Sequence, residues 1–231
     1  MNTFTGVWRI VWGDVKRSFF IFWAILIASS LVIIGVSQTV SSGSIYLVTN
    51  MPMLVYASVL GSQLFHNTFS YALSLGCSRG NFYKGLVGSL TFIILLLTVT
   101  HLIVWKAFDL IPSEAKVFNM WSFLTKEDHL LTFVWYDFIV SFMMLAIFLL
   151  LSVVRYRYGT NVLYVLAGLM FVAIFTGVVT EVIIERAVWF LNQPILIQSL
   201  WCIGTIFMMT ILVWPLVLKS KYRAKNQIQP Q

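Results

Sequence analysis

The sequence YALSLGCSRGNFYKG, residues 71–85, divides the chain at the point that decides its fold. Residues 18–78 contain no Asp, Glu, Lys or Arg, and neither do residues 85–105. Between these two runs stand two cations, Arg79 and Lys84, together with small and aromatic residues and no acid. A short cationic segment between long apolar runs is typical of a loop that joins two membrane-spanning helices. We expect another protein to bind the chain at this loop.

The composition assigns the whole chain to the membrane proteins. Of the 231 residues, 60% are hydrophobic and 10% are charged, and the mean hydropathy is +0.91. A water-soluble fold of this size cannot bury so much apolar surface. At about 20 residues per crossing, the length allows six spans with short connections. We therefore predict an all-α polytopic membrane protein whose single transmembrane domain covers residues 1–231.

The apolar runs give the positions of the six predicted spans, which are residues 19–36, 51–66, 85–105, 131–154, 162–184 and 195–218. Residues 1–17 have apolar side chains at helical spacing, which predicts an amphipathic helix on the membrane surface. A cleaved signal peptide is the alternative, although the apolar run that follows is longer than a usual signal core. The second span is expected to continue as helix through Ser74 and to stop at Gly76. Residues 106–130 are expected to rest on the bilayer surface through side chains such as Phe108 and Trp121.

The cations indicate the orientation of the spans. Of 15 Lys and Arg residues, eleven lie in the N-terminal segment, the second and fourth connections and the C-terminal tail, which hold three, two, two and four. The other connections hold four cations, and six of the acids lie on this cation-poor side of the spans. Because cytoplasmic loops are enriched in Lys and Arg, both termini and residues 71–85 are predicted to be cytoplasmic.

Ionisable residues inside the predicted spans are candidates for function. Asp137 lies six residues into its span, where a carboxylate facing lipid costs about 2.5–3.5 kcal/mol, and His101 lies at a similar depth in the neighbouring span. Glu181 lies in the outer part of the fifth span. One interpretation is a structural hydrogen-bonded pair between Asp137 and His101; the other is an outward-facing vestibule, with Glu181, that touches cationic cargo. Reduced transport by Asp137→Asn would favour the vestibule.

No catalytic motif accompanies these residues. The chain has no GxxxxGK phosphate loop and no HExxH, so we expect no catalytic residues, metal or cofactor in this chain. Cys77 falls in the loop and Cys202 in a span, which predicts two separate thiols. The net charge of +7 is explained by orientation in the membrane, so no nucleic-acid partner is expected.

Taken together, the six spans with cytoplasmic termini, the amphipathic first segment and YALSLGCSRGNFYKG after the second span resemble the permease subunits of type-2 ABC exporters. The resemblance is to the small bacterial permeases linked to export of, or immunity to, peptides and antimicrobials. It covers nearly the whole chain in topology, and its sequence motif is an aromatic residue, ALSLG, a Ser-Arg pair and Phe-Tyr-Lys-Gly. The chain departs from larger members in its short connection at residues 185–194, where the family often has a longer re-entrant outer segment. This difference argues against a closed outer gate of the usual form.

The resemblance implies a mechanism and partners. Residues 1–17 would be the connecting helix, and residues 70–84 the coupling segment, whose helix at 70–76 sits in a cleft of a separate ATPase that binds ATP and Mg²⁺. Two permeases would meet around the cargo path in the bacterial cell membrane. Within the coupling segment, buried contacts are expected from Tyr71, Leu73 and Leu75, and electrostatic orientation from Arg79 and Lys84.

A standalone membrane protein is the alternative from another class. It would be an ion-coupled carrier, or an immunity protein that sequesters a peptide without ATP. Carriers tend to place broken helices and ionisable groups near the membrane midplane, whereas the third, fifth and sixth spans have apolar centres. Co-purification with an ATP-binding subunit separates the two functions.

Overall fold

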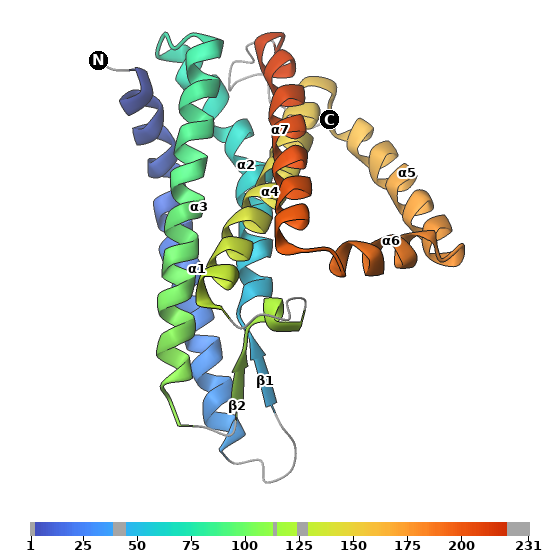
Figure 1. The fold of residues 1–231 in the computed structure, drawn as a ribbon. Helices are drawn as coiled ribbons and strands as arrows, with labels where there is room; N and C mark the ends of the chain where they lie inside the picture. The colour runs from blue at the N-terminus through green and yellow to red at the C-terminus, as the bar shows by residue number, and fades with distance from the viewer. Residues whose placement is uncertain (1–2, 39–44, 113–114, 124–128, 221–231) are drawn as a thin grey trace.

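The computed structural model describes residues 3–38, 45–112, 115–123 and 129–220. These residues form seven α-helices, one 3-10 helix (η1) and a pair of short strands (Figure 1). The elements, in chain order, are α1 (Thr3–Ser37), β1 (Ile45–Val48), α2 (Asn50–Ser74), α3 (Arg79–Asp109), β2 (Ala115–Phe118), η1 (Met120–Phe123), α4 (Leu130–Tyr158), α5 (Thr160–Val179), α6 (Val182–Leu191) and α7 (Ile195–Leu218).

Five of these helices are long and apolar enough to cross a membrane, namely α1, α3, α4, α5 and α7. The protein is therefore a helical chain with the character of a polytopic membrane protein. The predicted second span, residues 51–66, lies in α2, which is 25 residues long but is not one of the five. A total of six spans remains a prediction, because it requires that α2 also crosses the membrane.

The expected break between an interfacial helix at residues 1–17 and the first span is wrong. α1 is a single helix of 35 residues, about 52 Å long at 1.5 Å per residue. Its first part packs on the protein, because Val7, Val11 and Val15 are buried. The same stripe continues through Phe19 and Trp23, so one apolar face runs through the position at which a boundary was predicted.

The predicted fifth span, residues 162–184, also needs correction. α5 ends at Val179, and Glu181 turns the chain with φ 61°, a left-handed conformation that interrupts the helix. The predicted connection at residues 185–194 is mostly helical, since α6 extends to Leu191. A Cβ on Gly177 would lie 2.5 Å from Ile183, so this glycine permits the tight turn. Figure 1 shows α6 lying crosswise between the lower ends of α5 and α7.

Residues 106–130 are built differently from the surface segment that was expected. β2 pairs in parallel with β1, with Ile45 opposite Ala115 and Val48 opposite Phe118. Phe108 and Trp121 are 5% and 3% exposed, so these two side chains pack against protein and do not lie on the bilayer. The connections before α2 and before α4 thus meet at one end of the helices (Figure 1).

α2 lies at the centre of the fold and packs most extensively against α4. Its side chains Met53, Ala57, Phe65 and Phe69 are completely buried. The two helices approach each other closely at Gly61, where an added Cβ would lie 2.5 Å from the carbonyl oxygen of Leu145. A glycine at this position lets the two backbones approach.

We expect Gly61→Ala to destabilise the protein, because a methyl group at this contact must displace the α4 backbone. Overpacking of this kind costs about 1–3 kcal/mol, or about 5 °C in Tm. Gly35→Ala is the matched control, since a Cβ on Gly35 meets nothing within 4 Å and alanine is the better helix former. Thermal unfolding of the detergent-solubilised protein measures both. Equal stability of the two variants would contradict the close α2–α4 contact.

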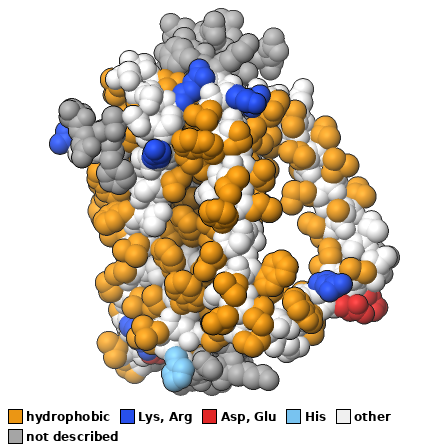
Figure 2. Space-filling view, turned by 45° about the horizontal axis from the view of Figure 1, so that its top comes forward, with side chains coloured by type: hydrophobic (Ala, Val, Ile, Leu, Met, Phe, Trp, Pro, Cys, Tyr) orange, Lys and Arg blue, Asp and Glu red, His pale blue; other side chains and the backbone are white. Residues whose placement is uncertain are grey.

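The cation-rich segments of the sequence gather at one end of the molecule. The start of α1, the α2–α3 turn, the α4–α5 turn and the end of α7 lie together at the top of Figure 1, and β1, β2 and α6 lie toward the other end. Figure 2 shows apolar side chains over most of the described surface, with several Lys and Arg side chains near the first of these ends. Successive connections along the chain therefore lie at opposite ends of the helices, and the cation-rich ones share one end.

Candidate functional site

The α2–α3 turn, residues 75–78, is a tight helical hairpin whose ends are both capped. Gly76 has φ 79° and donates to the carbonyl of Leu73, while the N–H of Cys77 bonds to the carbonyl of Ala72. These two bonds form the Schellman motif that ends a helix at glycine. The Ser78 hydroxyl accepts from the N–H of Asn81 at 3.3 Å and begins α3. The predicted helix end at Ser74 and stop at Gly76 are therefore confirmed.

A surface groove of about 580 Å³ lies at this turn and is lined by Leu73, Ser74, Cys77, Ser78 and Arg79. We call it the docking groove. Two apolar side chains of the turn face outward beside it, since Tyr71 is 56% and Leu75 63% exposed. The predicted helix at residues 70–76 is the last turn of α2 and not a separate element.

The five predicted coupling residues have four different environments. Tyr71 and Leu75 are exposed, whereas Leu73 is partly buried and packs against the core. Arg79 donates from Nη1 to the carbonyl oxygen of Leu218 at 2.7 Å, so it caps the end of α7. Lys84 does not line the docking groove; it lines a separate groove between α3 and α7.

An aromatic cluster lies directly beneath the docking groove. Phe69 stacks on Phe65 with ring centroids 4.6 Å apart, and it meets the edges of Phe82 and Tyr156 at 5.4 Å each. The Tyr156 hydroxyl is also 3.0 Å from that of Ser70. These rings join the end of α2 to the start of α3 and the end of α4. Sequence reasoning missed them because the four rings belong to three helices that only the fold brings together.

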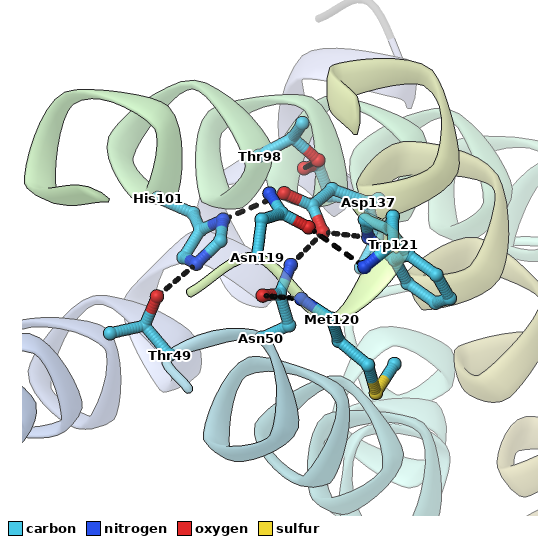
Figure 3. Close-up of polar contacts among 9 residues, drawn as sticks. Thr49, Asn50, Thr98, His101, Asn119, Met120, Trp121 and Asp137 are labelled. Atoms are coloured by element: carbon cyan, nitrogen blue, oxygen red, sulfur yellow. Dashed lines mark hydrogen bonds and ion pairs between the residues drawn. The ribbon is translucent and has the colours of Figure 1, made fainter. Parts of the chain in front are cut away.

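A buried polar cluster lies toward the opposite end of the helices. We define it as Thr49, Asn50, His101, Trp121 and Asp137, each no more than 3% exposed. The structure brings His101 and Asp137 together, with Nδ1 2.7 Å from Oδ2. The other carboxylate oxygen of Asp137 accepts from Asn50 Nδ2 at 2.6 Å and from Trp121 Nε1 at 2.5 Å. Figure 3 shows these side chains converging on the carboxylate.

The hydrogen bonds define the chemistry of this cluster. With Nδ1–H of His101 donating to Asp137, a neutral ring accepts from the Thr49 hydroxyl at Nε2, 2.8 Å away. Both carboxylate oxygens are thus occupied by donors from α2, α3 and η1. Such contacts compensate for the loss of water around a buried carboxylate. The geometry favours the structural interpretation of the pair over an open vestibule.

Asn50 is the first residue of α2, and its side chain does not cap the helix. Its Oδ1 accepts from the N–H of Met120 at 3.2 Å, and its Nδ2 binds Asp137. The amide therefore fixes η1 to the helices. Trp121, expected at the bilayer surface, joins the same cluster, and no local pattern marks either role.

Glu181 lies apart from this cluster. It is exposed at the turn between α5 and α6, which Figure 1 shows at the end of α6 remote from α7. The three predicted vestibule residues therefore do not form one site in the described part of the chain.

The two cysteines differ in accessibility. Cys77 lines the docking groove and is partly exposed, whereas Cys202 on α7 is 7% exposed. Burial raises the pKa of the Cys77 thiol above its ordinary value, so its thiolate fraction near neutral pH is reduced.

Comparison with known protein families, curated proteins and solved structures finds no significant match to this chain.

Proposed function

We propose that this chain is the permease subunit of an ATP-driven ABC exporter in a bacterial cell membrane. A separate ATP-binding subunit docks on the α2–α3 turn from the cytoplasm and supplies the energy of transport. The observation that carries the proposal is the capped turn with a groove beside it and two exposed apolar side chains, Tyr71 and Leu75. Exposed apolar anchors beside a concave surface are typical of sites at which a protein partner binds.

The contacts beneath the groove support transmission of movement into the helices. The aromatic cluster of Phe65, Phe69, Phe82 and Tyr156 joins α2, α3 and α4, and Arg79 adds α7 through the Leu218 carbonyl. A displacement of the turn would therefore be transmitted to four helices through packed side chains. Packed elements of this kind shift between discrete positions and do not deform gradually.

The cargo, the dimer and the cytoplasmic location of both termini belong to the same proposal. Amphipathic peptides or similar hydrophobic compounds are the expected cargo, and a second permease, identical or different, is the expected partner within the membrane. These expectations come from the family resemblance. Gly85 lies against Val7 and Gly177 against Ile183 of the same chain, so these two glycines are not available for close contact with a second permease.

The experiment that tests the proposal is purification of the chain with its native partners, followed by reconstitution into liposomes. We expect an ATP-binding subunit to co-purify and its ATP turnover to depend on the permease. Transport that proceeds with an ion gradient and without any ATP-binding subunit would instead identify a standalone carrier.

A further inference from the structure

The groove between α3 and α7 is distinct from the docking groove and has its own composition. It has a volume of about 520 Å³ and is lined by Tyr83, Lys84, Val87, Thr210, Ile211 and Trp214. We call it the α3–α7 groove. Its walls are mostly apolar, and Lys84 supplies the one charged side chain in this lining. Long apolar walls with one cation suit an amphiphile with a negatively charged head.

The α3–α7 groove lies where the polar heads of lipids are expected. Lys84 is in the second turn of α3, and Trp214 is close to the end of α7 at Leu218. Tyr83 and Trp214 meet edge to face at 5.1 Å, and such amphipathic rings are enriched at the level of the lipid headgroups. The predicted orientation places this end in the cytoplasmic leaflet, in which anionic lipids attract Lys and Arg.

The walls of the groove are held in place by the protein itself. The Tyr83 hydroxyl donates to the Thr210 carbonyl at 2.6 Å and fixes α3 against α7. Pro215, inside α7, has no N–H to donate to the carbonyl of Ile211 four residues earlier. This carbonyl therefore lacks its usual donor within the helix.

The charge of Lys84 is not neutralised within the described residues. Among those residues the one Lys or Arg in an ion pair is Lys106, with Asp109, and Lys84 is exposed. From the charge of Lys84, the apolar walls and the position at headgroup level, we propose that the α3–α7 groove binds an anionic phospholipid of the inner leaflet. The phosphate would pair with the Lys84 ammonium, and an acyl chain would lie along Val87 and Ile211. The inference does not depend on the proposed transport function.

Native mass spectrometry of the detergent-purified full chain tests this site. The probes are phosphatidylglycerol and phosphatidylcholine with identical acyl chains, added separately. We expect the wild type to retain phosphatidylglycerol preferentially. Lys84→Gln should lower its apparent affinity about fivefold, the effect of one cation near an anionic surface, and leave phosphatidylcholine unchanged. Val87→Trp, which fills the groove, should reduce retention of both lipids.

Two further variants separate the site from general charge effects and from misfolding. Lys84→Arg keeps the charge and should retain phosphatidylglycerol. Lys16→Gln removes an exposed cation from α1, which lies across α3 from α7 (Figure 1), and should change nothing.

Two results would overturn the proposal. They are unchanged lipid retention by Lys84→Gln and an equal loss in Lys16→Gln. If Lys84→Gln leaves lipid retention unchanged but loses association with an ATP-binding subunit, Lys84 returns to the protein-docking role.

Discussion

Replacement of Leu75 by Asp is expected to weaken association with the ATP-binding subunit strongly and to leave the fold intact. Leu75 is 63% exposed at the C-cap of α2, so its own chain buries little of it. Placing a carboxylate in the apolar centre of an interface costs at least about 2 kcal/mol, which weakens binding about 30-fold. Co-purification and ATP turnover in liposomes measure this loss.

The matched control is Leu110→Asp. Leu110 is the C-cap of α3 at the other end of that helix and is 84% exposed. Both substitutions place a negative charge at the C-terminus of a helix, where the cost to helix stability is the same, about 0.3–1 kcal/mol. We expect Leu110→Asp to bind the ATP-binding subunit normally. Normal association of Leu75→Asp would remove the α2–α3 turn from the docking surface.

Replacement of Asp137 by Ala is expected to cause the largest loss of stability. The change leaves Asn50, His101 and Trp121 without the acceptor that all three share. Breaking a buried charged contact in this way costs about 3–5 kcal/mol, or about 10 °C in Tm. Thermal unfolding in detergent, followed by size-exclusion chromatography, measures it. Asp109→Ala is the control, because the Asp109–Lys106 pair is about half exposed and contributes less than about 1 kcal/mol.

Asp137→Asn separates the structural role from a role in cargo binding. An asparagine retains an oxygen for Asn50 and Trp121, and its amide can donate to His101 if the imidazole changes tautomer. We therefore expect a small loss of stability and normal transport by Asp137→Asn. A stable variant that has lost transport would contradict the structural role and restore the vestibule.

The elements that could be predicted from sequence are those set by local signals. Residues 195–218 were predicted as the last span, and α7 has these bounds, because Pro194 and the charged tail delimit one apolar run. The end of α2 followed equally from Gly76, whose positive φ few other residues adopt. Local chemistry was sufficient in both places.

The predicted helix boundaries are wrong where an apolar run contains no sequence signal for a change in chain direction, or where an apolar face continues past an expected boundary. Residues 162–184 are uninterrupted in hydropathy except at Glu181. Gly177, which permits the turn between α5 and α6, lies inside α5 and does not mark the point at which the helix ends. Similarly, the apolar stripe of α1 continues past residue 17, and the charges between its apolar side chains do not break a helix. The four-residue strands β1 and β2 depend on each other across the sequence and cannot be identified separately.

The site was predictable in part for the same reason. Asp137 was identified because a carboxylate that faces lipid inside a span is unfavourable in free energy. His101 was identified as its partner because it lies at a similar depth in the neighbouring span. Asn50 and Trp121 come from a helix start and from η1, whose position only the fold determines. Lys84 was grouped with Arg79 by proximity in sequence, but helix geometry directs the two side chains to different grooves.

The central claim is that the α2–α3 turn faces the cytoplasm and receives a partner, and labelling of Cys77 tests it most directly. A membrane-impermeant maleimide should label Cys77 in a Cys202→Ser background in inverted vesicles and not in right-side-out ones. Because the pKa of Cys77 is raised, the rate should increase between about pH 7 and pH 9. Addition of the ATP-binding subunit should slow the reaction. Labelling from the outer side, or a rate unaffected by that subunit, would contradict the account.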